Sequence, residues 1–112
     1  MFVSVSELRH RITFLRPTST VDNEGNLIEE SQQTLFTLWA KVLPYAAKIS
    51  NGYAEKVEEI NYRIAIRYRE DIEVTDLISW RGKTLIQTAP PYGMDGKRKY
   101  LILEAKEFVE DG

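Results

Sequence analysis

The sequence predicts an all-β fold: a small β-barrel of about six to seven antiparallel strands, with long loops and at most one short helix. Isoleucine, valine and threonine number 25 of 112 residues and aromatic residues add 12, types that suit a pleated, half-buried surface. Several segments alternate apolar and polar residues, and they follow one another at roughly ten-residue spacing. The length suits one domain, residues 1–112.

The clearest strand signal runs from Ile60 to Arg69. Its even positions, which include Tyr62 and Tyr68, are apolar or aromatic, whereas its odd positions are mostly polar. Successive side chains of a strand point to opposite faces, so this alternation predicts one buried face and one polar face. The two tyrosines are therefore expected in the core.

Two further strands are predicted in the first half of the chain. Residues 35–43 alternate, and because Trp39 and Leu43 lie on the face opposite Phe36, this strand is expected to be covered on both sides. Residues 11–16 also alternate, and this strand is expected to stop at Pro17, which has no backbone N–H to donate.

The second half of the chain predicts hairpins. A strand over residues 72–80 leads to a tight turn at Gly82, which tolerates a positive φ, and residues 85–88 return. Residues 90–96 are expected to form a loop that ends in the turn pair Asp95-Gly96. A last strand is expected over residues 100–106.

Helix is expected to be scarce. Residues 6–9 suit a single capped turn, and the spacing of Tyr53, Val57 and Ile60 permits two helical turns after Gly52. Residues 18–34 form a polar arm or loop in which residues 27–30 are a possible extra strand. Residues 46–59 are too long for a hairpin turn, and long loops in compact domains are commonly functional.

Composition excludes several classes of function. The chain has no cysteine, which excludes disulfides, thiolate zinc sites and cysteine nucleophiles. Its net charge of −2 argues against strong non-specific binding of nucleic acid. No apolar run is long enough to span a bilayer, so no membrane partner is expected, and the first residues lack the pattern of a secretory signal.

No residue pattern predicts catalysis, and no cofactor or metal is expected. His10 is the only histidine, lies between two arginines, and is interpreted as a polar residue at a strand edge. The acidic groups at residues 58–59 and 70–73 lack the ligand spacing of a cation-binding loop and are interpreted as solvated turns. Phosphate-binding glycine motifs are absent from the sequence. A small hydrolase or lyase that depends on His10 is the least favoured alternative.

Arginines form a stripe on the polar face of the clearest strand, at Arg63, Arg67 and Arg69. With the basic cluster at residues 97–99, the stripe allows an alternative function, a small barrel resembling an oligonucleotide-binding fold that binds single-stranded nucleic acid. Because arginine is also enriched at protein interfaces, the stripe equally suits an interface with acidic residues of a neighbour. The acidic carboxyl end, with Glu104, Glu107, Glu110 and Asp111, offers one possible partner surface.

Six segments of the sequence are informative when taken together. Residues 6–14 open the series, residues 38–44 carry a Trp-Ala-x-Val block with a nearby proline, and residues 62–69 end in Arg-Tyr-Arg. Three shorter segments, at residues 22–25, 78–84 and 95–99, supply turns. In this order and spacing, the six segments resemble the phage head–tail joining family of head-closure, stopper and adaptor proteins. Residues 47–53 match more loosely the Gly-x-Glu-aromatic run that relatives often carry there.

This resemblance implies a structural protein of the virion neck of a tailed phage or prophage, made in the host cytoplasm. Relatives assemble as a ring, commonly of twelve copies, below the portal or an adaptor ring, where they retain packaged DNA in the head and dock tail proteins. By position, residues 46–59 are the candidate lumen loop and residues 18–34 a contact arm. The candidate loop residues are Lys48, Asn51, Gly52, Tyr53 and Lys56, and the candidate interface residues are Arg63, Arg67, Arg69, Glu107 and Glu110.

Overall fold

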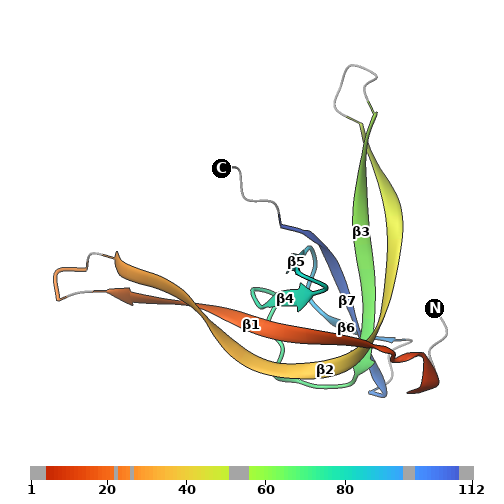
Figure 1. Ribbon diagram of the computed structural model, residues 1–112, viewed down its shortest axis with the longest axis horizontal. Coiled ribbons are helices and arrows are strands. Elements are labelled where there is room, and N and C mark those ends of the chain that lie inside the picture. The colour runs from red at the N-terminus through yellow and green to blue at the C-terminus, as the bar shows by residue number, and fades with distance from the viewer. Residues whose placement is uncertain (1–4, 22, 26, 51–55, 95–97, 109–112) are drawn as a thin grey trace.

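Seven antiparallel strands and one short 3-10 turn make up the computed structural model, which describes residues 5–21, 23–25, 27–50, 56–94 and 98–108 (Figure 1). No α-helix occurs among these residues. In chain order the elements are η1 (Val5–Glu7), β1 (His10–Val21), β2 (Leu27–Ser50), β3 (Lys56–Arg67), β4 (Leu77–Trp80), β5 (Lys83–Gln87), β6 (Tyr92–Gly93) and β7 (Tyr100–Glu107).

Six of the strands close into a barrel. They pair in the order β3-β2-β1-β4-β5-β7, and β7 pairs again with β3 along Asn61–Arg67, which completes the ring. The short strand β6 pairs with β7 beside Leu101 and Ile102. The predicted all-β barrel of six to seven strands is confirmed. Closure satisfies backbone donors and acceptors that an open sheet would leave along two edges.

Alternate residues of each strand fill the barrel. From β1 these are Ile12 and Phe14, which are fully buried, and from β3 they are Tyr62, Ile64 and Ile66. The rings of Tyr62 and Trp80 meet edge to face with centroids 5.5 Å apart. The alternation therefore predicts Tyr62, Ile64 and Ile66 correctly, whereas Ile60, at the start of the same pattern, is 50% exposed and Tyr68 is only partly buried. Each inward side chain contributes about 1.5 to 3 kcal/mol by leaving water.

A second, smaller apolar cluster lies on the outside of the barrel. Ala65, Tyr100 and Ile102 face outward from β3 and β7 but are buried beneath Leu8, which follows η1. The predicted turn at residues 6–9 thus corresponds to η1 and covers part of the outer face. Ala65, expected on a polar face, is fully buried for this reason.

Two long β-ribbons leave the barrel in different directions (Figure 1). In the first, β1 and β2 stay paired from Arg16 opposite Gln33 to Val21 opposite Leu27. In the second, β2 and β3 stay paired from Tyr45 opposite Asn61 to Ser50 opposite Lys56. The prediction of a loop over residues 46–59 is therefore wrong for residues 46–50 and 56–59, which are strand. The two helical turns predicted after Gly52 are wrong for residues 56–60; the predicted extra strand at residues 27–30 is confirmed.

Both ribbons contain a proline within a paired strand, and Pro17 was expected to end its strand. Pro17 pairs with Gln32 in β1, and Pro44 pairs with Tyr62 in β2. Among the described strands, β1 beyond Leu15 pairs with β2 alone, and β2 beyond Ala40 pairs with β3 alone. A strand with one neighbour has an outer edge where a missing N–H breaks no ladder hydrogen bond, so proline is tolerated there.

The β4–β5 hairpin turns at Arg81 and Gly82, with φ of 49° and 76° respectively, between Trp80 and Lys83. Positive φ at both central residues is typical of the two-residue hairpin turn whose backbone twist matches that of the flanking strands. The predicted turn is therefore confirmed. The strand before it is shorter than predicted, since residues 70–76 form an irregular connection with a turn at residues 74–75, and β4 begins at Leu77. Asp95 and Gly96 lie outside the described residues.

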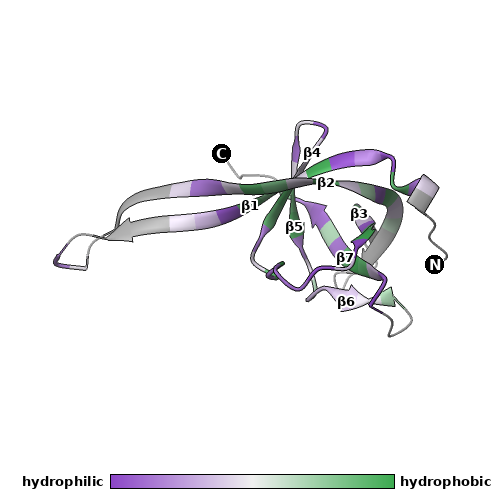
Figure 2. Cartoon of the chain, turned by 90° about the horizontal axis from the view of Figure 1, so that it is seen from below, coloured by the Kyte–Doolittle hydropathy of each residue, from purple (hydrophilic) through white to green (hydrophobic). Residues whose placement is uncertain are grey.

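The hydropathy of the strand residues differs between the barrel and the β1–β2 ribbon. In Figure 2 the strands are green where they line the barrel, and the β1–β2 ribbon turns purple as it leaves. The ribbon lacks an inward face there, which explains why its sequence shows no apolar alternation.

Candidate functional site

The described residues contain surfaces suited to assembly. Among them no group of three His, Asp or Glu side chains is placed to hold a metal ion. The described part of the chain also contains no helix long and apolar enough to cross a membrane. His10 begins β1, where its ring meets Trp80 edge to face at 5.8 Å and its Nδ1 lies 3.5 Å from an Arg81 nitrogen.

Two of the five candidate lumen residues, Lys48 and Lys56, belong to the β2–β3 ribbon. Lys48 pairs with Glu58 in its two strands, and Lys56 pairs with Ser50 at the last described rung. Asn51, Gly52 and Tyr53 lie outside the described residues. The candidate site is thus the far part of a paired ribbon, and the prediction that these residues act in the lumen stays a prediction.

The three arginines of the stripe have different partners, although Arg67 and Arg69 line the same hollow. Arg63 donates to Glu104 at 2.8 Å, and Arg69 donates to both carboxylate oxygens of Asp71 at 2.8 and 2.6 Å. Arg69 also lies over the Phe36 ring, 3.9 Å from its centroid. Arg67 is exposed at the end of β3. The structure therefore does not bring the three arginines together as one unit.

Glu104 gathers three donors on the outer face of the barrel. Arg63 Nε, the Tyr45 hydroxyl and the Tyr92 hydroxyl donate to it at 2.8, 2.8 and 3.0 Å. Its side chain is 17% exposed, and this burial alone raises its pKa; the hydrogen bonds from Arg63 and the tyrosines outweigh burial, so the pKa is lowered. The hydrogen bond that the Tyr45 hydroxyl donates to Glu104 raises the pKa of Tyr45.

The predicted acidic partners are placed as follows. Glu107 is exposed at the end of β7, and its backbone pairs with Leu85. Glu110 lies outside the described residues. Among the described residues no contact joins Glu107 to the arginine stripe, whereas Arg63 pairs with Glu104 at 2.8 Å within one copy. The acidic segment at residues 70–73 is exposed as expected, apart from half-buried Ile72.

The base of the β1–β2 ribbon carries a contact that the sequence did not indicate. Arg16 donates to both carboxylate oxygens of Asp76, at 2.8 and 3.0 Å, and Asp76 is completely buried. Asp76 also accepts from the Glu73 amide at 2.9 Å. This ion pair links the ribbon to the β3–β4 connection. Because its two residues are 60 positions apart in the sequence, no local sequence pattern could predict it.

A shallow groove opens on the outside of β2 around Trp39. Trp39 is 52% exposed, so the prediction that this strand is covered on both faces is wrong. The groove, of about 370 Å³, is lined by Leu8, Arg9, Trp39 and Arg67, and an adjoining hollow extends it to Thr37 and Arg69. Arg11 stacks over the Trp39 ring at 4.8 Å. The sequence predicts Trp39 as an apolar residue on a strand that is covered on both faces. It therefore gave no signal of an exposed tryptophan beside arginines.

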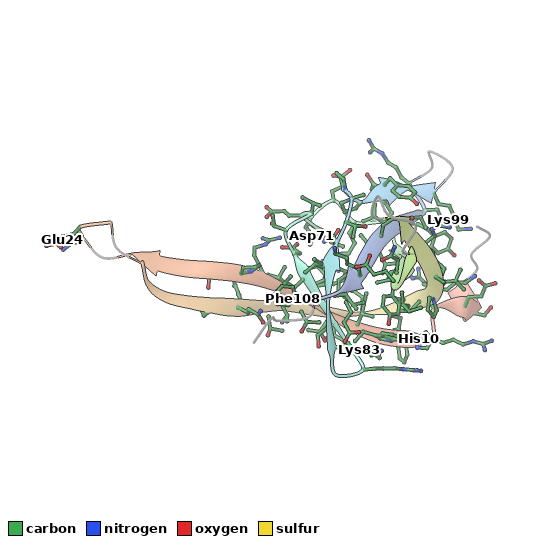
Figure 3. The ribbon with its side chains drawn as sticks, turned by 90° about the horizontal axis from the view of Figure 1, so that it is seen from above. His10, Glu24, Asp71, Lys83, Lys99 and Phe108 are labelled. Carbon is green, nitrogen blue, oxygen red and sulfur yellow. The ribbon has the colours of Figure 1, made fainter. Side chains whose placement is uncertain are left out.

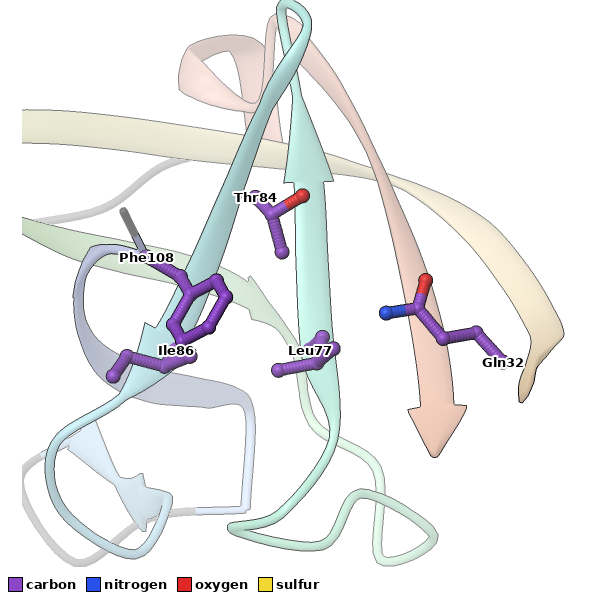
Figure 4. A pocket seen from close by; sticks show the side chains of 5 residues that line it. All are labelled: Gln32, Leu77, Thr84, Ile86 and Phe108. Carbon is purple, nitrogen blue, oxygen red and sulfur yellow. The ribbon is translucent and has the colours of Figure 1, made fainter. Parts of the chain in front are cut away.

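A second hollow, of about 410 Å³, lies between the β1–β2 ribbon and the β4–β5 hairpin (Figure 4). Phe108, which is 49% exposed, extends toward it from beyond β7, and the Phe108 amide donates to Thr84 at 2.7 Å. The other lining residues are Gln32, Leu77, Thr84 and Ile86. None of the described residues that line this hollow is charged, so this part of its lining offers packing area without a charge preference.

Comparisons with known proteins agree with this architecture. The chain is similar to protein SF1141 from Shigella flexneri 2a, whose solution structure matches with 28% identity and a TM-score of 0.71, over 97% of this chain and 100% of that one. A chain in the virion of a native gene transfer agent particle matches with 13% identity and a TM-score of 0.67, over 91% of this chain and 96% of that one. The protein xkdH of the phage-like element PBSX from Bacillus subtilis matches with 14% identity and a TM-score of 0.53, over 88% and 92%. At 13% and 14% identity, these last two likenesses bear on the fold alone.

A search of the curated proteins gave no match. Residues 3–107, nearly the whole chain, match the family described as phage head completion protein. The match covers the barrel, both ribbons and the groove around Trp39. The chain belongs to the phage head completion protein family.

Proposed function

We propose that this protein is a non-enzymatic component of the head–tail connector of a tailed phage or prophage. It assembles as a ring, with twelve the expected number of copies, below the portal or adaptor ring. There it closes the filled head and docks the tail. Membership of the phage head completion family supports a structural role in the virion and argues against an enzymatic one.

The observation that carries this proposal is the combination of a closed barrel with two projecting ribbons. The barrel has a complete core of its own, whereas the described ribbon residues beyond it contribute nothing to that core. An isolated two-stranded ribbon is marginally stable in water, so long ribbons gain most from contact with neighbouring molecules. A ring supplies such neighbours on both sides of every copy.

Each ribbon then takes one role. The β2–β3 ribbon, with Lys48 and Lys56 in its strands, serves as the lumen segment that DNA passes, and Asn51, Gly52 and Tyr53 act with it in the channel. The β1–β2 ribbon serves as the contact arm. The ring interface includes Arg63, Arg67, Arg69, Glu107 and Glu110, of which Arg67 and Glu107 are exposed and open to a neighbour. A chain with net charge −2 suits a channel along which DNA must slide.

The alternative function, binding of single-stranded nucleic acid on barrel tyrosines, lacks support from the tyrosine positions. Tyr62 and Tyr100 are buried and Tyr68 packs against the core, so none of the three offers a free ring face. Base stacking needs an exposed ring.

Co-sedimentation with portal rings from the same genome, followed by negative-stain imaging, tests the proposal. We expect a stoichiometric extra layer of density at the narrow end of the portal, or of the portal–adaptor complex. Portal rings shown to bind a known partner serve as the competence control. Absence of the layer, with this protein folded, would contradict the proposed position in the virion neck.

A further inference from the structure

The two ends of the paired strands β1 and β2 carry opposite charge. Residues 17–40 contain four acidic residues, at positions 22, 24, 29 and 30, and no lysine or arginine. At the other end of the same strand pair, in the barrel, Arg9 and Arg11 lie beside His10. Figure 3 shows Glu24 at the tip of the ribbon and His10 at the opposite side of the molecule. A single element therefore presents an acidic end and a basic end.

The basic end is also the place of the Trp39 groove. Leu8 and the half-exposed Trp39 ring supply apolar surface, and Arg9 and Arg67 line the same groove. Aromatic residues and arginine are the types enriched at protein interfaces. The groove thus combines an apolar anchor point with a rim of positive charge.

The rim charges are not neutralised within the described part of the chain. Arg9 donates to the Ser6 carbonyl, Arg11 stacks on Trp39, and neither they nor Arg67 forms an ion pair among the described residues. The acids nearby are committed elsewhere: Glu7 pairs with Lys41 and Asp71 with Arg69. Three arginines around an apolar groove match an acidic segment that carries apolar residues.

The tip of the β1–β2 ribbon has that chemistry. Its acids are interspersed with Val21, Leu27 and Ile28 in the sequence. The tip cannot occupy the groove of its own copy, because ten strand residues separate Arg11 from Val21, a span of about 34 Å. The ladder to Val21 opposite Leu27 holds the ribbon extended over this span.

We propose that the tip of the β1–β2 ribbon of one copy docks in the Trp39 groove of the next copy. Acidic side chains of the tip pair with Arg9, Arg11 and Arg67, and apolar tip residues pack on Trp39 and Leu8. Because tip and groove are different surfaces at opposite ends of one strand pair, the contact is head-to-tail. Contacts of this kind generate rings when the rotation closes. The inference deepens the proposed function and rests on it for the ring.

Disulfide trapping tests the contact directly, because the chain contains no cysteine of its own. Asn23 at the tip and Thr37 in the groove are both exposed and uncharged, and each is replaced singly by cysteine. Oxidation of Asn23→Cys mixed with Thr37→Cys is expected to give a disulfide-linked heterodimer, and the double variant a ladder of multimers. The matched control pairs Asn23→Cys with Thr88→Cys, an exposed threonine beyond β5 and outside the groove.

Charge exchange supplies the second readout. Glu24→Arg and Arg67→Glu are each expected to lower the trapped yield at least fivefold, and the double variant Glu24→Arg, Arg67→Glu to restore it. Lys83→Glu, which reverses an exposed cation on the β4–β5 hairpin, serves as the control and is expected to leave the yield unchanged. Raising the salt concentration is expected to slow trapping, as it screens exposed charges.

Trapping is run both in solution and on portal rings imaged as above, so that the two proposals fail separately. A ring on the portal without the Asn23–Thr37 crosslink overturns this contact and leaves the proposed function standing. A crosslink in solution without a ring on the portal supports the contact and contradicts the proposed function. Binding of a thymidine 20-mer, followed by quenching of Trp fluorescence, tests the other occupant of the groove. If crosslinks are absent and Arg67→Glu weakens this binding, the groove is a nucleic-acid site and the proposed contact is overturned.

Discussion

The Arg16 guanidinium forms two hydrogen bonds with the carboxylate of Asp76, Nε to Oδ1 at 2.8 Å and Nη2 to Oδ2 at 3.0 Å. Arg16 stands in β1 where the ribbon leaves the barrel, and Asp76 is buried immediately before β4. The Gln87 side chain donates to the carbonyls of Glu73 and Asp76 and holds the same turn. The ribbon is therefore anchored at its base by a fixed, bidentate ion pair.

Replacing Asp76 with alanine is expected to lower the free energy of unfolding by about 3 kcal/mol, because it breaks a pair with a fully buried member. Urea denaturation followed by circular dichroism measures the change. Asp71→Ala is the matched control: Asp71 is an exposed acid of the same connection that pairs with Arg69, and its loss is expected to cost under about 1 kcal/mol. Equal losses for the two variants would contradict an anchoring role for Asp76.

Glu104→Gln is expected to destabilise the protein by about 1 to 2 kcal/mol at neutral pH. The substitution removes the negative charge of a carboxylate that accepts hydrogen bonds from Arg63 and two tyrosines. The folded pKa of Glu104 is lowered, so its contribution is present above the unfolded pKa, near 4.3, and is lost as pH falls through the folded value. The difference between wild type and variant should therefore shrink toward zero in acid.

Urea denaturation at pH 7 and at several acidic pH values measures this convergence. Glu107→Gln, at the exposed end of the same strand, is the control and is expected to change stability little at any pH. A difference between wild type and Glu104→Gln that stays constant from neutral to strongly acidic pH would show that charge at Glu104 is not the stabilising feature.

The sequence predicts those parts of the fold in which a local sequence pattern and the packing of the barrel favour the same structure. Tyr62, Ile64 and Ile66 alternate because β3 has one face in the core, and Gly82 marks a turn because its φ is positive. Local periodicity also places Tyr62 in the core, which decides against a stacking role.

The sequence predicts the ribbons only in part, because they do not pack a face against the core of the barrel. Without a core side, residues 46–50 and 56–59 need no apolar alternation, and Val57 and Ile60 coincide by chance with helical spacing. Pro17 resembles a strand end because the sequence does not reveal that β1 has a single neighbour there. The Arg16–Asp76 pair and the Trp39 groove join distant segments, so they exist only once the barrel has closed.

Gly82→Ala is expected to destabilise the whole domain by about 1 kcal/mol. An added Cβ meets no atom within 4 Å, so the cost arises from the positive φ alone. Gly25 is the matched control, since its φ is also positive and its surroundings are also open, but it lies at the tip of the β1–β2 ribbon. Gly25→Ala is expected to leave the urea midpoint nearly unchanged, because strain at a ribbon tip is relieved by local fraying. An equal shift of both midpoints would contradict this.

Tyr62→Ala is expected to lower the free energy of unfolding by about 3 to 5 kcal/mol, as for other buried aromatic residues. Trp39→Ala, which removes a half-exposed ring, is expected to cost under about 1 kcal/mol. Thermal unfolding of the two variants separates core from surface. A stable Tyr62→Ala protein that has lost single-strand binding would instead favour the nucleic-acid alternative.

Shortening the β1–β2 ribbon separates folding from assembly. Residues 19–30 are replaced by Asn-Gly, which joins Thr18 to Ser31, a pair whose hydroxyls lie 2.8 Å apart in the ribbon. The urea midpoint is expected to change little, because none of the described residues removed lies in the core and Asn-Gly favours a two-residue hairpin turn. Ring formation on portal particles, measured by negative stain, is expected to be lost with the acidic tip. Gly25→Ala, which keeps the ribbon and its charge, should still assemble. If the shortened protein forms complete rings, the ribbon is not the contact arm; if it fails to fold, the ribbon belongs to the stable domain.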